Sequence, residues 1–411
     1  MNLRGGHNGT LVSGATRLRR RRFLRGVAAC ALAPAGMGVG PGCTAPTGAR
    51  STPGGFWVAA HGATGGGAFG LVAVPSEGSP EAASAQHSEP GRIPTGFRGH
   101  DVAAHPLIPG LVALFGRRPA TRSAVVDILR RRVVAMIEAQ PGRAFQGHGF
   151  FTPDGRLLVT TEADTLTGEG KLGLRETETF SFVAELDTHG IGPHEAQIMP
   201  DAATVVVANG GLLTRPETGR QVLNLDSMDS SLSYLALASG ELLEQRRVAE
   251  PKSSIRHLDV AQDGTVAFGV QVQREALDHE EVVPLAGTHR RGGEVQLFSH
   301  GHEYLPLMND YVGSVALCSQ TRVAGFTSPR GDIALFWHAD SGELVGVHRL
   351  ADCSGLAVAS DGGHFVLSSS LGEVRVLSTT DLVEDRGARQ RFEGLQWDNH
   401  LIEVAVDREQ A

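Results

Sequence analysis

Aromatic residues are scarce in this chain, at 5% of 411 residues, while 53 residues are glycine and 41% are hydrophobic. Such a composition suits thin strands joined by tight turns and argues against a long helical core. We therefore expect an all-β fold.

Cysteine is also rare, with four in the whole chain. Cys30 and Cys43 fall in the N-terminal region discussed below, which leaves Cys318 and Cys353 in the body. These two predict either a disulfide between neighbouring repeats or a pair of buried thiols. The sequence has no Cys-x-x-Cys-His motif, which excludes covalently attached haem.

Several catalytic motifs are missing as well. There is no Gly-x-Ser-x-Gly elbow, His-Glu-x-x-His helix, phosphate loop or Rossmann fingerprint. The sequence therefore offers no support for a serine hydrolase triad or for nucleotide chemistry.

What the chain does contain is a repeat. At intervals of roughly 40 to 60 residues, a polar residue opens a short apolar run that ends in a turn of Pro, Asp or Gly. A period of this size, with several short strands in each unit, is typical of a β-propeller. The opening residues are His100, His148, Glu195, His257 and His400, and two further runs open at Ser314 and Gly355.

The two ends of the chain supply complementary halves of one unit. Residues 401–406 match an innermost strand, whereas 56–60 and 69–74 form two strands without such a partner. Joining them predicts a seventh blade that closes the ring and removes exposed sheet edges. We expect residues 56–406 to form one seven-bladed propeller, with a flexible linker at 44–55 and a tail at 407–411.

Three insertions interrupt the repeat. Residues 75–98 are rich in Ser, Pro, Glu and Ala and are expected to be mobile, whereas 209–231 and 271–293 are expected to cap one face.

The N-terminus predicts export. Arg20 and Arg21, followed by Phe23, Leu24 and an apolar stretch rich in Ala and Gly, resemble the signal of the twin-arginine pathway. We assign residues 1–43 to this signal and expect a periplasmic protein, either soluble or lipid-anchored at Cys43. A disordered basic tail is the alternative interpretation.

Charge argues against one class of partner. Residues 1–43 carry seven arginines and no acidic residue, so the rest of the chain is more acidic than the overall net charge of −8. An acidic surface without a basic stripe disfavours nucleic acid.

The polar residues that open the repeats predict a metal or ligand site. A propeller brings the innermost strands together at one channel mouth, and histidine is the commonest metal ligand. His194 and Glu195 are neighbours whose side chains should alternate, yet we expect both to contribute. The candidate ligands of a transition metal, iron or copper in preference to zinc, are His100, His148, His194, Glu195, His257 and His400. The alternative is that these histidines are structural residues that tie adjacent strands by hydrogen bonds.

Other polar residues are candidates for contacts to a bound ligand. His189 and His289 could join the ring from loops, and Arg330 could contact an anion. For Asn209 a turn is the favoured explanation, because asparagine tolerates left-handed backbone. The ligand-contact set is Asn209, Arg256, His289 and Arg330, and if the protein is an enzyme Glu162 and Glu195 would carry the catalysis.

Eight motifs together resemble the bacterial family known as DUF1513. They lie at residues 147–155 (GHGFFTPDG), 161–162 (TE), 189–195 (HGIGPHE), 208–211 (ANGG), 255–258 (IRHL), 289–292 (HRRG), 311–314 (YVGS) and 327–331 (TSPRG). The resemblance implies a propeller exported by the twin-arginine pathway. It also implies a role in periplasmic iron handling, because the genes of such proteins often lie beside those of imelysin-type iron-uptake proteins and a dihaem oxidoreductase. The family has no established activity.

Three functions remain open at this point. The leading hypothesis is an exported monomeric propeller that binds a metal ion, or a ligand carrying one, and acts as an accessory to iron uptake. The second is a metal-dependent hydrolase or lactonase. The third is an interaction platform without a metal, because a fold does not determine a function.

Overall fold

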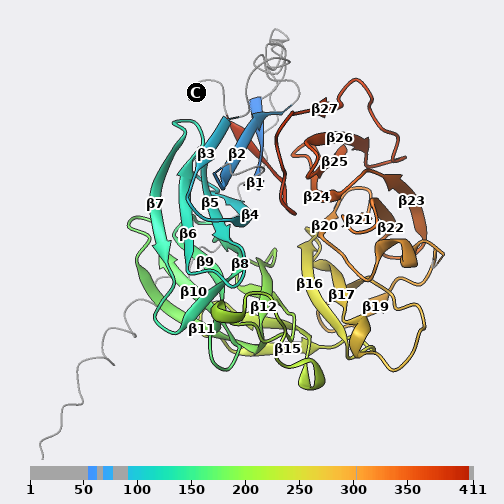
Figure 1. Cartoon of the computed structure of the whole chain (residues 1–411), viewed down its shortest axis with the longest axis horizontal. Coiled ribbons are helices and arrows are strands. Elements are labelled where there is room, and N and C mark those ends of the chain that lie inside the picture. The colour runs from blue at the N-terminus through green and yellow to red at the C-terminus, as the bar shows by residue number, and fades with distance from the viewer. Residues whose placement is uncertain (1–53, 63–67, 77–90, 302, 407–411) are drawn as a thin grey trace, which may run out of the picture. The chain divides into compact units, whose positions relative to one another are not determined.

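The computed structural model describes residues 54–62, 68–76, 91–301 and 303–406. Over these residues the chain forms seven four-stranded sheets, which Figure 1 shows as blades around a central axis. This confirms the predicted all-β, seven-bladed propeller. In this part of the chain no helix has the length and apolar character needed to cross a membrane. The predicted export signal with Arg20, Arg21, Phe23 and Leu24, and the predicted tail, lie outside the described residues.

Each blade is an antiparallel sheet whose strands follow one another outward from the axis. The innermost strands are β4 (Gly99–Ala104), β8 (Arg143–Phe151), β12 (Pro193–Ile198), β16 (Ser253–Val260), β20 (Ser314–Leu317), β24 (Cys353–Val358) and β28 (Ile402–Val406). The second strands are β5 (Leu111–Gly116), β9 (Leu157–Asp164), β13 (Thr204–Asn209), β17 (Thr265–Val272), β21 (Val323–Ser328), β25 (His364–Ser369) and β1 (Gly54–His61).

The outer half of each blade is a further hairpin. Its third strands are β6 (Arg122–Asp127), β10 (Glu169–Glu176), β14 (Ser231–Ala236), β18 (Ala286–Arg290), β22 (Ile333–His338), β26 (Glu373–Ser378) and β2 (Gly70–Pro75). The outermost strands are β7 (Arg132–Glu138), β11 (Phe182–Ile191), β15 (Leu242–Arg246), β19 (Gln296–Leu297), β23 (Leu344–Arg349), β27 (Gln390–Arg391) and β3 (Gly91–Pro94).

The closing blade is built from both ends of the chain, as predicted. β28 pairs with β1 from Gly54 opposite Val406 to Val58 opposite Ile402. Two predicted boundaries need correction. β1 begins at Gly54, inside the expected linker, and β3 lies inside the segment expected to be mobile. Each deviation has its own cause. β1 pairs with the full length of β28, and β3 covers the outer edge of β2 with Ile93 buried.

The two other insertions differ from each other. Residues 209–231 contain the short 3-10 helices η3 (Pro216–Thr218) and η4 (Leu225–Ser227). Residues 271–293 contain η5 (Arg274–Ala276) and also β18, so this stretch is not simply a capping loop. β18 completes its blade by pairing with β17. A further 3-10 helix, η6 (Leu305–Met308), precedes β20.

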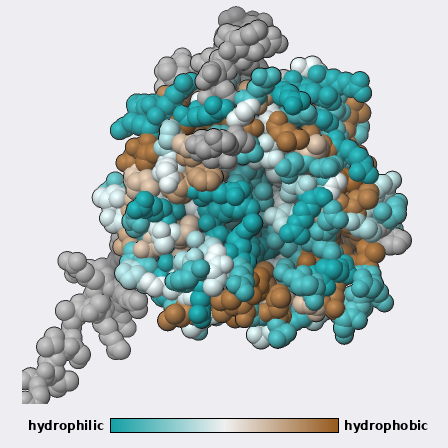
Figure 2. Space-filling model, in the orientation of Figure 1, coloured by the Kyte–Doolittle hydropathy of each residue, from teal (hydrophilic) through white to brown (hydrophobic). Residues whose placement is uncertain are grey.

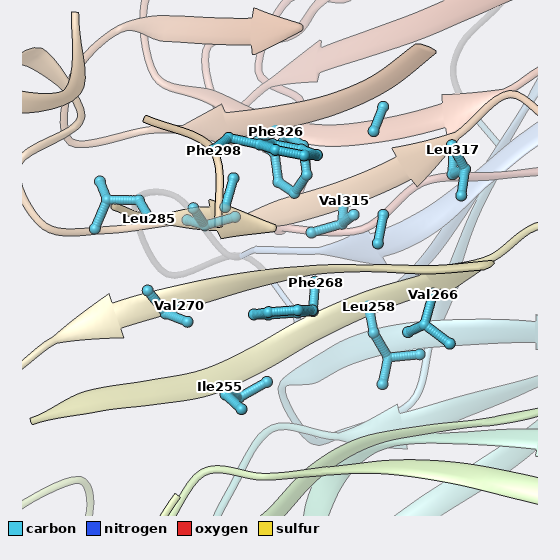
Figure 3. Packing of buried hydrophobic residues seen from close by; sticks show 14 of the residues in the cluster. Ile255, Leu258, Val266, Phe268, Val270, Leu285, Phe298, Val315, Leu317 and Phe326 are labelled. Atoms are coloured by element: carbon cyan, nitrogen blue, oxygen red, sulfur yellow. The ribbon is translucent and has the colours of Figure 1, made fainter. Parts of the chain in front are cut away.

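Apolar side chains from neighbouring blades pack face to face. Figure 3 shows Leu258 and Phe268 of one blade beside Val315 and Phe326 of the next, all of them buried. Burying one such side chain contributes about 1.5–3 kcal/mol. These contacts fix the blades against one another and so fix where the innermost strands begin.

Cys318 and Cys353 lie together in one apolar cluster as free, buried thiols. Of the two alternatives that the sequence left open, the structure shows the pair of thiols. Burial raises the pKa of Cys353, so its thiol stays protonated and unreactive.

Candidate metal centre

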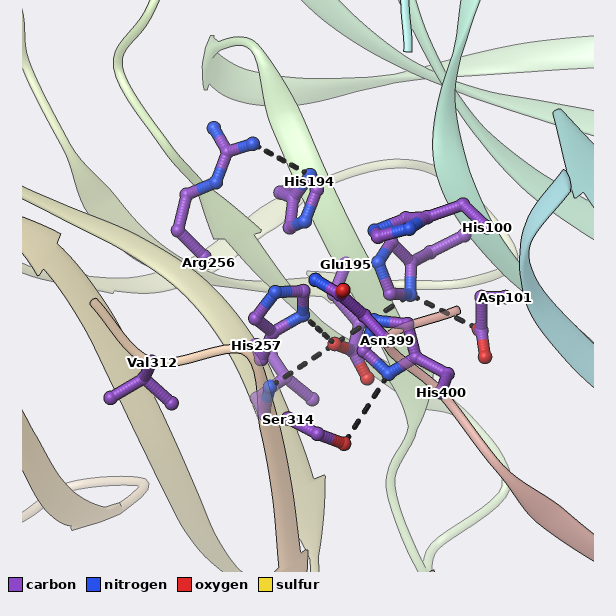
Figure 4. Close-up of polar contacts among 12 residues, drawn as sticks. His100, Asp101, His194, Glu195, Arg256, His257, Val312, Ser314, Asn399 and His400 are labelled. Carbon is purple, nitrogen blue, oxygen red and sulfur yellow. Dashed lines mark hydrogen bonds and ion pairs between the residues drawn. The ribbon is translucent and has the colours of Figure 1, made fainter. Parts of the chain in front are cut away.

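Five histidines lie close together where the innermost strands meet, and Figure 4 labels four of them, His100, His194, His257 and His400. His100, His148, His194 and His257 lie on β4, β8, β12 and β16, and His400 lies two residues before the start of β28. All five side chains are buried. Their imidazoles form a compact cluster, which we call the histidine ring. Centroids of successive imidazoles lie 4.6–4.9 Å apart, and His148 and His400, which are not successive, also lie 4.7 Å apart.

β-bulges explain how adjacent residues reach the same site. Side chains of a regular strand alternate between faces, which would send one residue of each adjacent pair away from the axis. The pairing register shifts around His100 on β4, around His148 on β8, around His194 on β12 and around Arg256 on β16. A bulge re-aims side chains locally. Consequently His194 and Glu195 both face the site, as expected from the sequence.

Most of the histidines are held through Nδ1 by a neighbouring blade. Asp101 lies 3.0 Å from Nδ1 of His148, and Glu195 lies 3.3 Å from Nδ1 of His257. Asp398 lies 3.4 Å from Nδ1 of His100. A carboxylate on Nδ1 fixes the tautomer whose Nε2 is free to bind a metal.

The opposite nitrogens are unpaired. Nε2 of His148, His257 and His400 are each buried without a hydrogen-bond partner. A structural histidine would use both nitrogens, because an unsatisfied buried polar atom costs about 1–3 kcal/mol. The arrangement therefore fits a bound metal ion better than it fits a purely structural role.

Three overlapping groups of these residues could hold a metal, and within each the ligand atoms all lie within 4.8 Å of one another. The first group is His100, His257 and His400. The others are His100, His148 and His194, and His148, Glu195 and His257. Because the groups share His100, His148 and His257, the described residues offer alternative sets of ligands, two of imidazoles alone and one of two imidazoles with a carboxylate.

The electrostatics favour neutral imidazoles. Burial lowers the pKa of His100, His148, His194 and His257 well below the usual value. Burial, followed by the neighbouring His148, lowers the pKa of His400 to about 3. Neutral imidazole is the form that binds metals, so the ring is ready for an ion at neutral pH.

The carboxyl groups beside the ring shift in the opposite direction. Burial raises the pKa of Glu195 well above its usual range and that of Asp101 to about 6. A cation in the ring would stabilise the charged form of both groups. Both also line a cavity of about 440 Å³ that all seven innermost strands enclose.

Comparison with known families decides the relationship that the sequence motifs suggested. A family model described as "Protein of unknown function (DUF1513)" matches residues 93–404, which include all five histidines. The chain belongs to the DUF1513 family.

The comparison with solved structures concerns the fold of this DUF1513 protein. The chain is similar to the Kuenenia stuttgartiensis hydrazine synthase, with a TM-score of 0.58 and 16% sequence identity. The match covers 76% of this chain and 90% of that one. At this identity the likeness shows the fold alone. A search of curated proteins found no match.

Glu162 does not join the ring, although the sequence suggested it as a catalytic residue. Its carboxylate accepts hydrogen bonds from Arg175 and Thr160, each at 2.7 Å, inside the second blade. The guanidinium of Arg175 also lies over the ring of Phe145. This fully buried ion pair joins β9 and β10.

His189 and His289 do not join the ring either. Nε2 of His189 lies 2.9 Å from the carbonyl oxygen of Gly240. His289 lies on β18, not in a loop, and contacts the hydroxyl of Tyr234 at 2.7 Å. Both histidines hold the outer parts of blades.

Asn209 also has a structural setting, at the end of β13. Its side-chain amide donates to the carbonyl oxygen of Thr188 and to the hydroxyl of Ser233, each at 3.0 Å. The amide nitrogen therefore has a structural role, while Oδ1 of Asn209 is buried without a hydrogen-bond partner.

The two candidate arginines have different positions. Arg256 is buried and its Nη2 lies 3.1 Å from Nδ1 of His194, so it belongs to the site. Arg330 is exposed, and its guanidinium lies over the ring of Tyr311 at 4.3 Å.

Sequence reasoning missed the residues that hold the histidines. Asp101 and Asp398 carry no motif of their own, although Asp101 follows His100 directly and Asp398 lies just before His400. The signal that could have identified them is an acidic residue close in sequence to a histidine of a predicted metal site.

Proposed function

We propose that this protein binds one transition metal ion, or a ligand that carries one, at the ring of His100, His148, His194, His257 and His400. The observation that carries the proposal is the set of three buried, unpaired Nε2 atoms on His148, His257 and His400. Each would gain a partner if an ion were bound, which removes the cost of leaving it unsatisfied.

Iron and copper are the ions we propose, in preference to zinc. Imidazole nitrogen accepts all three, so the donor set by itself permits any of them. The preference for iron derives from the family resemblance, and copper follows from its high affinity for nitrogen ligands. Asp101, Glu195 and Asp398 would balance the charge of the ion from behind the imidazoles.

The proposed setting is the periplasm, where the protein would act as a monomeric accessory to iron uptake. The twin-arginine motif at Arg20 and Arg21 supports export, with lipid attachment at Cys43 as a variant of the same proposal. An imelysin-type protein or a periplasmic dihaem oxidoreductase would be the partner. The support for these partners is the gene context that the family resemblance implies.

Metal content tests the proposal directly. Protein recovered through its own export route should contain about one iron or copper per chain by elemental mass spectrometry. His148→Ala and His257→Ala should each lose most of it. His364→Ala is a matched control, because His364 lies outside the ring and its side chain is 45% exposed. Near-zero contents of iron, copper and zinc in the native protein would contradict the proposal.

A further inference from the structure

Several arginines gather on the side of the histidine ring where the innermost strands begin. We call this side the strand-start face and define it by Arg98, Arg117, Arg118, Arg220 and Arg256. Arg98 directly precedes β4, and Arg117 and Arg118 directly follow β5. Gly99 pairs with Gly116, so these chain ends meet at one edge of the first blade. Arg220 comes from the connection between β13 and β14, and Arg256 from the first half of β16.

These arginines lie close enough to feel one another's charge. Arg118, Arg117 and Arg220 lie near enough to Arg256 for their positive charges to act on its buried guanidinium. Burial, together with the positive charges of Arg220 and Arg117, lowers the pKa of Arg118 to about 10. Like charges at short range repel, so an anion among them would relieve the repulsion.

The acidic residues nearby compensate only part of this charge. Asp398 accepts hydrogen bonds from Arg98 at 3.0 Å and from Arg117 at 2.6 Å. Among the ion pairs of the described residues, none involves Arg118, Arg220 or Arg256. The chain as a whole has a net charge of −8, so this local excess of positive charge does not reflect its composition.

Arg256 also decides the tautomer of His194. A guanidinium can only donate hydrogen bonds, so Nδ1 of His194 must accept from Nη2 of Arg256. Neutral His194 therefore carries its proton on Nε2 and presents an N–H group. Nε of Arg256 is itself buried without a partner. Together the two side chains present unused hydrogen-bond donors at the site.

The other side of the ring has the opposite charge. Asp101, Glu195, Asp259 and Glu403 line the cavity that extends along the innermost strands. The sign of the charge therefore changes from the arginines to the carboxylates across the histidines. Figure 2 shows hydrophilic residues gathered over the centre of the ring in the face it displays.

We infer that the strand-start face binds a small oxyanion or carboxylate, held by Arg118, Arg220, Arg256 and the Nε2 hydrogen of His194, as a ligand of the metal ion. This inference rests on the proposed metal site, since the anion occupies the side of the ion that the imidazoles leave open. The carboxylate-lined cavity is then the approach for the cation. Arginine suits this role because its planar group of donors matches a carboxylate or phosphate.

Calorimetric titration with inorganic phosphate, and separately with oxalate, tests the inference. Both anions are titrated into the full protein, metal-free and loaded with Cu²⁺, in buffer without other oxyanions or carboxylates. The double variant Arg118→Gln/Arg220→Gln changes one half-buried and one exposed side chain, neither of them in an ion pair among the described residues, so it should fold. Arg122→Gln is the matched control, because Arg122 is exposed on β6 and pairs with Glu138.

We expect phosphate or oxalate to bind the copper-loaded protein more tightly than the metal-free protein. The double variant should weaken that binding at least tenfold (about 1.4 kcal/mol) without changing the copper content, and Arg122→Gln should change neither. One copper per chain with no binding of either anion would overturn the inference and leave the metal site standing. Equal anion affinity in the wild type and the double variant would overturn it as well. Anion binding by a protein that takes up no metal would overturn the proposed function instead and leave an anion site.

Discussion

The five histidines of the ring are of two kinds, which differ in the group that lies next to Nδ1. A carboxylate faces Nδ1 of His100, His148 and His257, and the hydroxyl of Ser314 lies 3.4 Å from Nδ1 of His400. Each of these partners can accept a hydrogen bond and so leave Nε2 with its lone pair. Arg256 instead donates to His194, which makes His194 a hydrogen-bond donor at the site.

This difference predicts that two neighbouring histidines respond differently to the same substitution. His148→Gln removes a metal ligand and should abolish most of the metal content. His194→Gln should retain the metal, because glutamine keeps an N–H donor and no ligand is lost. Elemental analysis of the two variants, purified in parallel, makes the comparison. Equal loss of metal in both would show that His194 is also a ligand.

The sequence predicted the histidines but not their partners. His100, His148, His257 and His400 each open an apolar run, so the repeat alone assigns them to the channel mouth. Asp398 reaches His100 across the junction of the first and closing blades, and Arg256 reaches His194 across the junction of the third and fourth blades. Such contacts depend on how blades pack side by side, which no local pattern encodes.

At the scale of the strand, β-bulges determine which side chains reach the histidine site. Gly147 lies in the bulge of β8 with φ of +111°, a conformation that L side chains rarely adopt. A Cβ atom there would lie 2.7 Å from Cδ2 of His100. Glycine at this position therefore lets β8 bend and lets His100 approach His148.

Gly147→Ala should accordingly weaken both the fold and the site. We expect a loss of roughly 1–3 kcal/mol in the free energy of unfolding, from backbone strain, and lower metal affinity because the ring of His100 must move. Gly142→Ala is the control, since Gly142 has φ of +75° but no atom within 4 Å of the added Cβ. Chemical denaturation with metal titration measures both effects, and identical behaviour of the two variants would contradict the role given to His100.

The closing blade makes β28 important for the whole ring. Leu401, Val404 and Val406 are buried, so losing them would cost roughly 5 kcal/mol and would leave the edge of β1 unpaired. Deleting residues 400–411 should lower the unfolding temperature sharply, whereas deleting 407–411, beyond β28, should not. Differential scanning calorimetry tests this, and a truncated chain as stable as the full one would rule out closure by β28.

The sequence predicted strands correctly where turn-forming residues separate two apolar runs. The turn at residues 152–155 separates two apolar runs and correctly placed β8 and β9. β3 and β18 were missed because they are short and lie in segments rich in polar residues. Their position is imposed by the blade, which needs a partner for β2 and for β17.

For the whole molecule, the buried histidines predict a dependence of stability on pH. Their folded-state pKa values are lowered, so below pH 6.5 the unfolded chain binds more protons than the folded chain, and stability falls as pH falls. Glu195 and Asp101, with raised pKa values, act in the opposite direction: their contribution to stability is lost as pH rises, for Asp101 between its unfolded value of 3.8 and about 6.

Because the five histidines outnumber these two carboxyl groups, we expect the metal-free protein to unfold at a lower temperature at pH 5 than at pH 7.5. His257→Gln should reduce the difference, since it removes one of the groups responsible. Thermal unfolding at the two pH values provides the measurement. An equal or higher unfolding temperature at pH 5 would mean that the histidines are not buried in neutral form.

The central claim is that the unpaired imidazole nitrogens at the axis of the ring hold a transition metal. Anomalous X-ray scattering at the iron and copper absorption edges, from crystals of protein matured through its own export route, tests it most directly. We predict one anomalous peak inside the ring, within bonding distance of Nε2 of His148 and His257. A crystal of metal-replete protein with no peak there, or with its metal bound elsewhere, would contradict the claim.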